Sequence, residues 1–208
     1  MITVKEAQRV RIKNTPLPIK YANFFETLPQ NTQWTMGVAG KPGAGKSSML
    51  LDFSGILSRY DKVLYANFEE NVEGGTIQQK VKAMQVLTKY PWAKNRLVFL
   101  NSTDINDLHS YLKTGKYKYL VIDSVNKLKS RGSIKTNEIL AIKDQYPKVS
   151  QIYVYHYRKD GKGYKGESDF EHEHDFFVEV QKGGTATFIK NRFKTTKTLK
   201  FDKLQIFN

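Results

Sequence analysis

Short apolar runs alternate with amphipathic segments along most of the chain after residue 30. Runs rich in Val, Ile, Leu, Phe and Tyr predict β-strands, and the segments between them carry apolar residues at helical spacing. This alternation predicts an α/β fold with a mostly parallel sheet flanked by helices and antiparallel strands near the C-terminus. We expect strands over 34–39, 62–67, 96–100, 119–123, 151–157, 176–180, 185–191 and 198–207, and helices over 46–58, 76–88, 105–113 and 137–145.

No internal repeat or low-complexity linker interrupts the pattern, and Pro and Gly fall singly between the periodic segments. The pattern therefore predicts one domain over residues 31–208, preceded by a basic segment over 1–30 that serves as an oligomerisation or linker element. In a mostly parallel sheet, the loops at the carboxyl ends of the strands form the binding site. We therefore look for the chemistry in those loops.

The composition narrows the class of partner. The 208 residues include 34 Lys and Arg against 20 Asp and Glu, a formal net charge of +14, together with 12 Tyr, 12 Phe and 2 Trp. This mixture favours nucleic acid over anionic lipid as a partner, with general solubility as the alternative reason for the charge. The absence of cysteine excludes disulfides, thiolate metal sites and cysteine nucleophiles.

The sequence has no signal-peptide pattern and no apolar run of 18 residues. We therefore expect no membrane association and a cytoplasmic location, in a prokaryotic cell or in a virus or mobile element expressed in one.

A glycine-rich string separates the first predicted strand from the first predicted helix. Its glycines let backbone N–H groups approach phosphate oxygens, and the following helix adds the positive end of its dipole. Lys46 is expected to reach the β and γ phosphates of ATP, and Ser47 is expected to bind Mg²⁺. An ordinary glycine-rich turn is the alternative. The string is Gly40-Lys41-Pro42-Gly43-Ala44-Gly45-Lys46-Ser47, followed by Ser48, and it fits G-x-x-x-x-G-K-[ST].

Acidic residues follow two other predicted strands. Asp123 ends the apolar run that starts at Tyr119, and it is the candidate to support Mg²⁺ opposite Ser47. Glu69 and Glu70 follow the strand over 62–67, so either one could activate water as a general base. The alternatives are a strand-end Asp that caps a turn and ordinary surface acids.

These motifs resemble those of the RecA-type ATPases, most closely the core of bacterial RadA proteins, with DnaB-like helicases and KaiC as relatives. Glu69-Glu70-Asn71 resembles a Glu-Glu-Ser run whose first acid is the catalytic glutamate, so the resemblance selects Glu69. The run V-I-D-S-V over 121–125 resembles the Walker B strand. The resemblance covers about residues 24–193, and it implies a RecA-like fold that binds ATP and Mg²⁺ between subunits of a hexamer-like ring or a filament.

The same resemblance assigns three further site residues. His156 is similar to the polar residue that senses the γ-phosphate at the end of the fifth core strand, with a solvated strand-end His as the alternative. Lys190-Asn191-Arg192-Phe193 matches a K-N-R-F signature, which implies that Lys190 and Arg192 reach the γ-phosphate of a neighbouring subunit. Two residues depart from the family pattern, Lys194 in place of Gly and Arg158 in place of Thr.

The histidine-rich segment over 171–175 offers a second reading. In an extended segment His172 and His174 would lie on one side, as in a metal site. No third ligand is predicted, and Gly166, Glu171, His172 and Asp175 instead match the G-x-x-x-x-E-H-x-x-D spacing of the family.

Two basic loops follow core strands at the places where RecA-type proteins contact DNA. We expect both to bind phosphates of DNA, in particular single-stranded DNA, without sequence preference. Tyr157 and Tyr164 are available to stack on unpaired bases. The first loop, over 126–136, contains Lys127, Lys129, Arg131 and Lys135, and the second, over 157–170, contains Arg158, Lys159, Lys162 and Lys165.

Taken together, these features predict an ATP-hydrolysing, DNA-dependent RecA-fold motor or recombinase-like protein that acts in recombination, repair or replication. One alternative is a KaiC-like assembly protein whose contacts are controlled by nucleotide and do not depend on DNA. Another is a small-molecule kinase on a P-loop fold, for which the sequence shows no arginine-rich lid.

Overall fold

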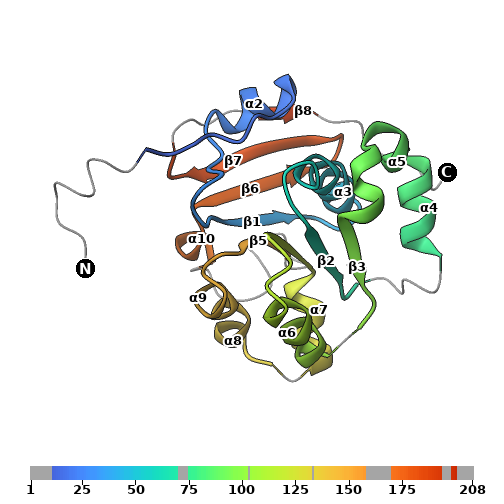
Figure 1. Cartoon of the computed structure of the whole chain (residues 1–208), viewed down its shortest axis with the longest axis vertical. Helices are drawn as coiled ribbons and strands as arrows, with labels where there is room; N and C mark the ends of the chain where they lie inside the picture. The colour runs from blue at the N-terminus through green and yellow to red at the C-terminus, as the bar shows by residue number, and fades with distance from the viewer. Residues whose placement is uncertain are drawn as a thin grey trace.

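A twisted sheet of eight strands forms the centre of the molecule (Figure 1). The computed structural model describes residues 11–69, 75–102, 104–132, 134–157, 170–193 and 198–200. Across the sheet the strands follow the order β3-β2-β4-β5-β1-β6-β7-β8. They span β1 (Thr35–Gly40), β2 (Val63–Asn67), β3 (Leu97–Leu100), β4 (Tyr119–Asp123), β5 (Ser150–His156), β6 (Phe176–Gln181), β7 (Thr185–Asn191) and β8 (Thr198–Lys200).

Helices cover both faces of this sheet. Helices α2, α3 and α5 contribute to one hydrophobic cluster, and α6, α7, α8 and α9 contribute to the cluster on the other face. The helices span α2 (Ile19–Phe25), α3 (Lys46–Leu57), α4 (Thr76–Ala83), α5 (Val86–Lys89), the 3₁₀ helix η1 (Pro91–Asn95), α6 (Ile105–Lys113), α7 (Val125–Gly132), α8 (Thr136–Leu140), α9 (Ile142–Gln145) and α10 (Phe170–Glu173).

The buried strands alternate their side chains between the two clusters. On β4, Tyr119 and Val121 lie in the cluster with α3, whereas Leu120 and Ile122 lie in the cluster with α6. All five residues of β4 are buried, as expected of a central strand covered by helices on both faces. This burial explains why β4 is a nearly unbroken apolar run that ends in a single acid.

The register brings the carboxyl ends of the core strands to one end of the sheet. Gly40 pairs with His156 between β1 and β5, and Asn67 pairs with Asp123 between β2 and β4. Strands β3, β2, β4, β5, β1 and β6 run parallel, and β7 and β8 are antiparallel to their neighbours. The predicted α/β class, with a parallel core and an antiparallel extension, is therefore confirmed.

Two predicted helices are each broken into two. The helix predicted over 76–88 forms α4 and α5, because Gln85 adopts a left-handed conformation with φ of 52°. The helix predicted over 137–145 forms α8 and α9, which meet at Ala141. In both cases a short second helix buries one apolar residue, Val86 or Ile142.

The segment predicted as a basic loop over 126–136 is mainly helix α7. Val125 and Leu128 are buried, three residues apart, while Lys127 and Lys129 are exposed. The spacing is that of an amphipathic helix with its basic side facing solvent. The segment is predicted as a loop because its many basic residues obscure the helical spacing of Val125 and Leu128.

Helix α2 belongs to the segment 1–30 that the sequence sets apart. Its Phe24 stacks on Phe188 of β7 with ring centroids 4.1 Å apart, and its Phe25 is fully buried. Asp52 of α3 accepts hydrogen bonds from Tyr21 Oη at 3.0 Å and from Tyr90 Oη at 2.7 Å. Residues of this segment therefore contribute to the main core and contact the helix that follows the glycine-rich loop.

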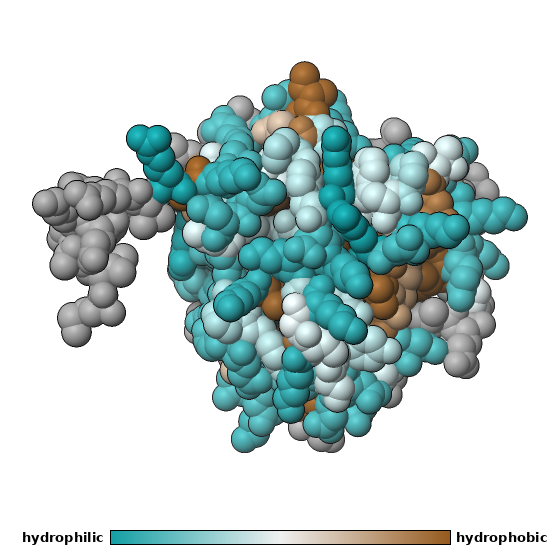
Figure 2. All heavy atoms as spheres, in the orientation of Figure 1, coloured by the Kyte–Doolittle hydropathy of each residue, from teal (hydrophilic) through white to brown (hydrophobic). Residues whose placement is uncertain are grey.

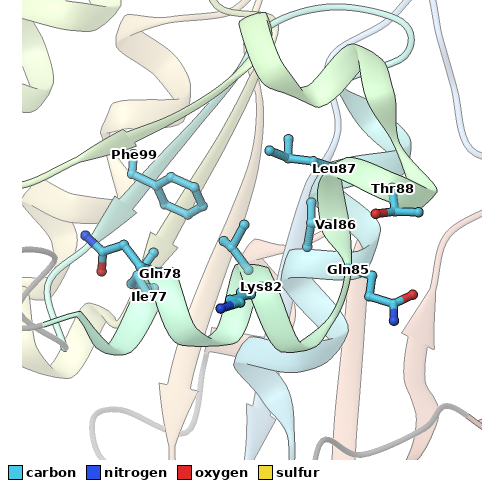
Figure 3. Close-up of a pocket in the computed structure, with 9 residues that line it drawn as sticks. Ile77, Gln78, Lys82, Gln85, Val86, Leu87, Thr88 and Phe99 are labelled. Atoms are coloured by element: carbon cyan, nitrogen blue, oxygen red, sulfur yellow. The ribbon is translucent and has the colours of Figure 1, made fainter.

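An apolar groove of about 450 Å³ lies between α4, α5 and β3 (Figure 3). Figure 2 shows apolar surface beside these elements on a face that is otherwise mostly hydrophilic. Its apolar lining includes Ile77, Val81, Leu87 and Phe99, none of which the sequence marks as a site residue. Among the described residues, no helix combines the length and apolar character needed to cross a membrane.

Candidate nucleotide site

The glycine-rich loop connects β1 to α3 at the carboxyl end of the sheet. Gly43 and Gly45 have positive φ values of 70° and 102°, which residues with a side chain rarely adopt. A Cβ on Gly40 would lie 2.3 Å from the carbonyl oxygen of Val180, so only glycine fits beside β6. Gly45 caps α3 without a side-chain hydrogen bond, which leaves N–H groups of the first helical turn available to an anion.

The remaining predicted loop residues lie around this turn. Lys41, Pro42 and Gly43 are exposed, Ala44 and Ser48 are buried, and Ser47 is half-buried. The N–H of Ala44 donates to the carbonyl oxygen of Lys41 at 3.1 Å, which closes the turn. The loop therefore presents backbone to solvent at its tip and rests on buried side chains at its base.

Lys46 lies under the loop and is only 6% exposed. Its Nζ donates to the carbonyl oxygens of Gly40 at 2.9 Å and Lys41 at 3.1 Å. Burial lowers the pKa of Lys46, and the negative charges of Asp123 and Glu69 oppose that shift. An ammonium group has three donors, so one remains for a phosphate oxygen.

Asp123 ends β4 directly opposite Ser47. Its Oδ2 accepts hydrogen bonds from Ser47 Oγ at 3.0 Å and from Tyr65 Oη at 2.8 Å. Its Oδ1 is buried and has no hydrogen-bond partner in the described part of the chain. Burial raises the pKa of Asp123, and the charge of Glu69 raises it further.

This arrangement suits Mg²⁺. A hydroxyl and a carboxylate at one point are the hard oxygen ligands that Mg²⁺ prefers, and it commonly completes its shell with water and phosphate oxygens. A cation would also satisfy the unpartnered Oδ1 and offset the cost of an ionised carboxylate in a buried place. Ser47 and Asp123 therefore fit the predicted metal site, with Tyr65 as a positioning residue.

Glu69 lies beside this pair, two residues after the end of β2. Its backbone N–H donates to the carbonyl oxygen of Asp123 at 3.1 Å, and its Oε2 lies 3.1 Å from His156 Nε2. Burial alone raises the pKa of Glu69, but the hydrogen bond and charge of His156, with Lys46 and Lys127, outweigh burial and lower it. The side chain is therefore a carboxylate at neutral pH, able to accept a proton.

The start of α7 contacts the same group of residues. The N–H of His156 donates to Asn126 Oδ1 at 2.8 Å, and the charge of Lys127 contributes to the lowered pKa of Glu69. The peptide bond between Asp123 and Ser124, at the start of this segment, is cis. Sequence reasoning missed both Asn126 and Tyr65, because neither residue belongs to the motif by which the site was recognised.

Lys190 and Arg192 lie at the other end of the sheet. Lys190 pairs with Phe177 on β6, and Phe177 pairs with Gly37 on β1, three residues before Gly40. At about 3.3 Å per residue, Lys190 is set back about 10 Å along the strands from the end of β1. Neither predicted finger therefore joins the Lys46 cluster of its own chain.

Both basic side chains are held by the segment around α10. Lys190 Nζ donates to the carbonyl oxygens of Glu171 at 2.9 Å and His172 at 3.0 Å. Arg192 Nη1 lies 3.2 Å from Asp175 Oδ1, and its Nη2 donates to the carbonyl oxygen of His172 at 3.2 Å. These contacts place the two cations side by side on the surface.

The segment with two histidines is not extended. His172 lies in α10 and is exposed, whereas His174 is fully buried and bonds to Tyr155 Oη through Nε2 at 2.8 Å. Burial lowers the pKa of His174 to about 3. The two histidines do not share a face, and no group of three or more His, Asp or Glu side chains among the described residues is placed to hold a metal.

The structure places only part of the predicted DNA-binding residues. Lys127 and Lys129 are exposed on α7, where Lys129 Nζ donates to Thr136 Oγ1 at 3.0 Å, and Lys135 precedes α8. Arg131 lies on α7, and its side chain is not described. The predicted residues of the second loop, Arg158, Lys159, Lys162 and Lys165, lie outside the described residues, as do Glu70, Asn71, Tyr164, Gly166 and Lys194.

Comparison with known proteins gives relatives that match these motifs. The chain is 27% identical over 183 residues to the DNA repair protein RadA of Streptococcus pyogenes serotype M3, and 26% identical to that of serotype M6. Each match covers 81% of this chain, which spans 38% of the length of these curated relatives. No protein-family model matches the chain.

Solved structures share the fold. A KaiC-like protein, PH0186 of Pyrococcus horikoshii, aligns with a TM-score of 0.64 at 18% identity and covers 91% of this chain and 93% of its own. The RadB recombinase aligns with a TM-score of 0.61 at 15% identity, over 86% of this chain and 90% of its own. The chain therefore has the RecA-like α/β fold that its motifs predict.

Proposed function

We propose that this chain hydrolyses ATP with Mg²⁺ and that DNA stimulates the reaction, as in a RecA-fold motor or recombinase-like protein of DNA recombination, repair or replication. The main support is the convergence of Lys46, Asp123 and Glu69, which follow or end β1, β4 and β2, at the carboxyl end of the sheet. The likeness to DNA repair protein RadA supports the DNA-related role.

Each residue of the cluster has one task in this reaction. The loop from Gly40 to Ser47 binds the phosphates through its backbone, and Lys46 stabilises the charge that develops on the γ-phosphate. Mg²⁺, when bound, neutralises charge on the β and γ phosphates. Since Oε2 of Glu69 is bonded to His156, its Oε1 is the atom that accepts the proton of the attacking water.

DNA and nucleotide are coupled through helix α7 in this proposal. Lys127 and Lys129 lie on its exposed side and bind DNA phosphates, while Asn126 on the same helix accepts from the N–H of His156. A shift of α7 on DNA therefore changes the position of His156 and, through it, of Glu69. This path gives a physical reason for DNA to accelerate hydrolysis.

The site is completed by a second copy of the chain. Lys190 and Arg192 are set back from the Lys46 cluster of their own chain, and they form a pair of cations on the surface. Such cations stabilise transition-state charge when they enter a neighbouring site. ATP then lies between subunits, and hydrolysis requires assembly.

The test compares ATP hydrolysis by the native protein, Lys46→Ala, Arg192→Ala and an equal mixture of the two variants. The measurement covers a range of protein concentrations with and without single-stranded DNA. We expect each variant to be inactive alone and the mixture to recover part of the activity, since one variant supplies an intact loop and the other an intact Arg192. Activity of the native protein should rise steeply with protein concentration and with DNA.

Two controls separate a role in a neighbouring site from a role in folding. Asp175→Asn weakens the ion pair of Arg192 but leaves the guanidinium in place, so it should retain activity if Arg192 acts on a neighbour. Lys182→Ala removes an exposed cation at the turn after β6 and should act as the native protein. A native protein whose turnover is independent of DNA and of its own concentration contradicts the proposal.

The fold shared with a KaiC-like protein supports one other candidate, a nucleotide-switched assembly protein. In that case nucleotide controls contacts between copies, and DNA has no role. The two candidates differ in one measurement, because only the DNA-dependent protein binds single-stranded DNA at low salt. Light scattering with and without ATP reports the assembly in both cases.

A further inference from the structure

The end of the sheet opposite the glycine-rich loop carries a separate concentration of positive charge. Four segments, over 58–62, 90–96, 113–118 and 146–149, lead into β2, β3, β4 and β5. They contain eight cations and a single acid, Asp61. The cations are Arg59, Lys62, Lys94, Arg96, Lys113, Lys116, Lys118 and Lys148, and all are exposed or half-buried.

Three of these cations form a row across neighbouring strands. The N–H of Lys118 donates to the carbonyl oxygen of Lys62 at 3.0 Å, and the N–H of Val63 donates to that of Arg96 at 2.8 Å. Arg96, Lys62 and Lys118 therefore precede β3, β2 and β4 side by side. Neighbouring strands lie about 4.8 Å apart, so the backbones of the three basic residues lie within about 10 Å of one another.

Carboxylates of the described residues form no ion pair with this row. In the described ranges, no Asp or Glu oxygen lies within 4.0 Å of the charged nitrogens of Arg96, Lys62 or Lys118. Asp61 is the nearest acid in sequence, and its Oδ1 accepts the backbone N–H of Lys62 at 2.7 Å. Like charges on neighbouring strands repel each other, and a polyanion would relieve that repulsion.

Two guanidinium groups, that of Arg96 in the row and that of Arg59 beside it, are ordered by contacts with the protein. Arg59 lies over the ring of Trp92, with its Cζ 5.5 Å from the ring centroid. Arg96 Nη1 donates to the carbonyl oxygen of Arg59 at 2.8 Å, and its other donors remain for a ligand. Ordered guanidinium groups bind phosphate in a bidentate manner at a reduced entropic cost.

We propose that Arg96, Lys62 and Lys118 form the centre of a second contact for nucleic acid, which binds phosphates of the backbone without sequence preference. The four segments contain none of the large exposed apolar side chains of the described residues, so they offer no apolar anchor for a bilayer. Those side chains are Ile12, Ile19, Leu87, Tyr111 and Ile189. This contact goes beyond the proposed function, in which DNA lies on α7 and the loop after β5.

The test measures binding of a fluorescein-labelled DNA duplex of mixed sequence by anisotropy over a series of salt concentrations. In the amino-end variant the row is neutralised, and the loss of three phosphate contacts should reduce the slope of log affinity against log salt by about 2.7. ATP hydrolysis with and without single-stranded DNA is measured on the same proteins. The proteins are the native chain, the amino-end variant (Lys62→Gln, Arg96→Gln, Lys118→Gln), a helix variant (Lys127→Gln, Lys129→Gln, Lys135→Gln) and a charge-matched control (Lys82→Gln, Lys182→Gln, Lys200→Gln).

The results distinguish this inference from the proposed function. The inference is supported if the slope of log affinity against log salt falls in the amino-end variant, stays native in the control, and DNA still stimulates hydrolysis by the amino-end variant. A native slope in the amino-end variant overturns the inference whether or not DNA stimulates hydrolysis, whereas absent stimulation in the native protein counts against the proposed function alone. If the amino-end variant binds DNA normally but loses binding to phosphatidylglycerol vesicles, the surface serves a membrane and the inference is overturned.

Discussion

The two ends of the central sheet use charge in opposite ways. At the carboxyl end, the cation Lys46 lies with the two acids Asp123 and Glu69, and each is buried or half-buried and hydrogen-bonded. At the amino end, Lys62 and Lys118 lie side by side on adjacent strands, and neither ammonium group forms an ion pair with a carboxylate of the described residues. The first arrangement orders reacting groups in a small volume, whereas the second provides a long-range attraction that salt screens.

A third group of cations shows that the amino end is not uniform. Near β6, Arg192 lies 3.2 Å from Asp175, and Lys143 lies 2.6 Å from Glu173. Ion pairs therefore hold the cations near β6, whereas the described residues form none with the row before β3, β2 and β4. The two groups of cations at this end of the sheet thus differ in how firmly the chain's own acids hold them.

The largest expected effect tests the carboxyl end. Glu69→Gln removes the proposed base but keeps the size of the side chain and an oxygen near His156. We expect kcat for ATP hydrolysis to fall about 10²- to 10⁴-fold while ATP still binds. Steady-state hydrolysis and equilibrium binding of a fluorescent ATP analogue measure the two effects, with Glu138→Gln on α8 as the matched control. A kcat of a tenth of the native value or more in this variant would show that Glu69 is not the general base.

A substitution of His156 tests whether this histidine lowers the pKa of Glu69. Burial favours protonated Glu69, but His156, Lys46 and Lys127 outweigh it, so the pKa lies below the ordinary value of 4.5. Activity that needs the carboxylate therefore persists as pH falls until that lowered pKa is reached. His156→Ala removes the hydrogen bond, so the acid limb of the kcat profile should move to higher pH. His109→Ala is the control, and an unmoved limb contradicts the assignment.

A single substitution at the amino end tests whether its cations act independently. Lys62→Gln removes one phosphate contact and should reduce the salt slope of duplex binding by about 0.9. Lys118→Gln should produce the same change, and Lys82→Gln on α4 should produce none. The double variant should lose the sum of the two reductions. A salt slope in the double variant equal to that of one single variant would show that the two lysines do not bind separate phosphates.

The smallest effect concerns stability at the carboxyl end. Burial raises the pKa of Asp123, so ionising this carboxyl group costs more free energy in the folded chain than in the unfolded chain. Ionisation of Asp123 therefore destabilises the fold above the ordinary pKa of an aspartate, and this destabilisation disappears as pH falls. Asp123→Asn should therefore raise the urea midpoint at pH 7 modestly, while it abolishes hydrolysis that depends on Mg²⁺. A lower midpoint would contradict this reading of Asp123.

Much of the carboxyl end could be predicted because its residues belong to local patterns. The loop from Gly40 to Ser47 has a fixed spacing, and Asp123 and Glu69 each follow a recognisable apolar strand. The order of those strands then brings the three groups together, as the structure confirms. The roles of the individual residues remain predictions.

The parts that escaped prediction depend on contacts between distant segments. Tyr65 bonds to Asp123 across two strands, and His174 is buried among Tyr153, Tyr155 and Phe177, although its neighbours in sequence are charged. Likewise, the row of cations at the amino end depends on strand register, because Lys62 and Lys118 lie far apart in the sequence. A composition count shows the positive charge but does not locate it.

The stack of Phe24 on Phe188 has a consequence for the order of folding. These rings meet across a separation of 164 residues, the difference between 188 and 24, so their contact closes a very long loop. During synthesis the stack cannot form until β7 has left the ribosome. Tyr21, on the same helix, bonds to Asp52 of α3. Helix α2 can therefore contact α3 early in synthesis, but its contact with β7 forms only after residue 188 has been made.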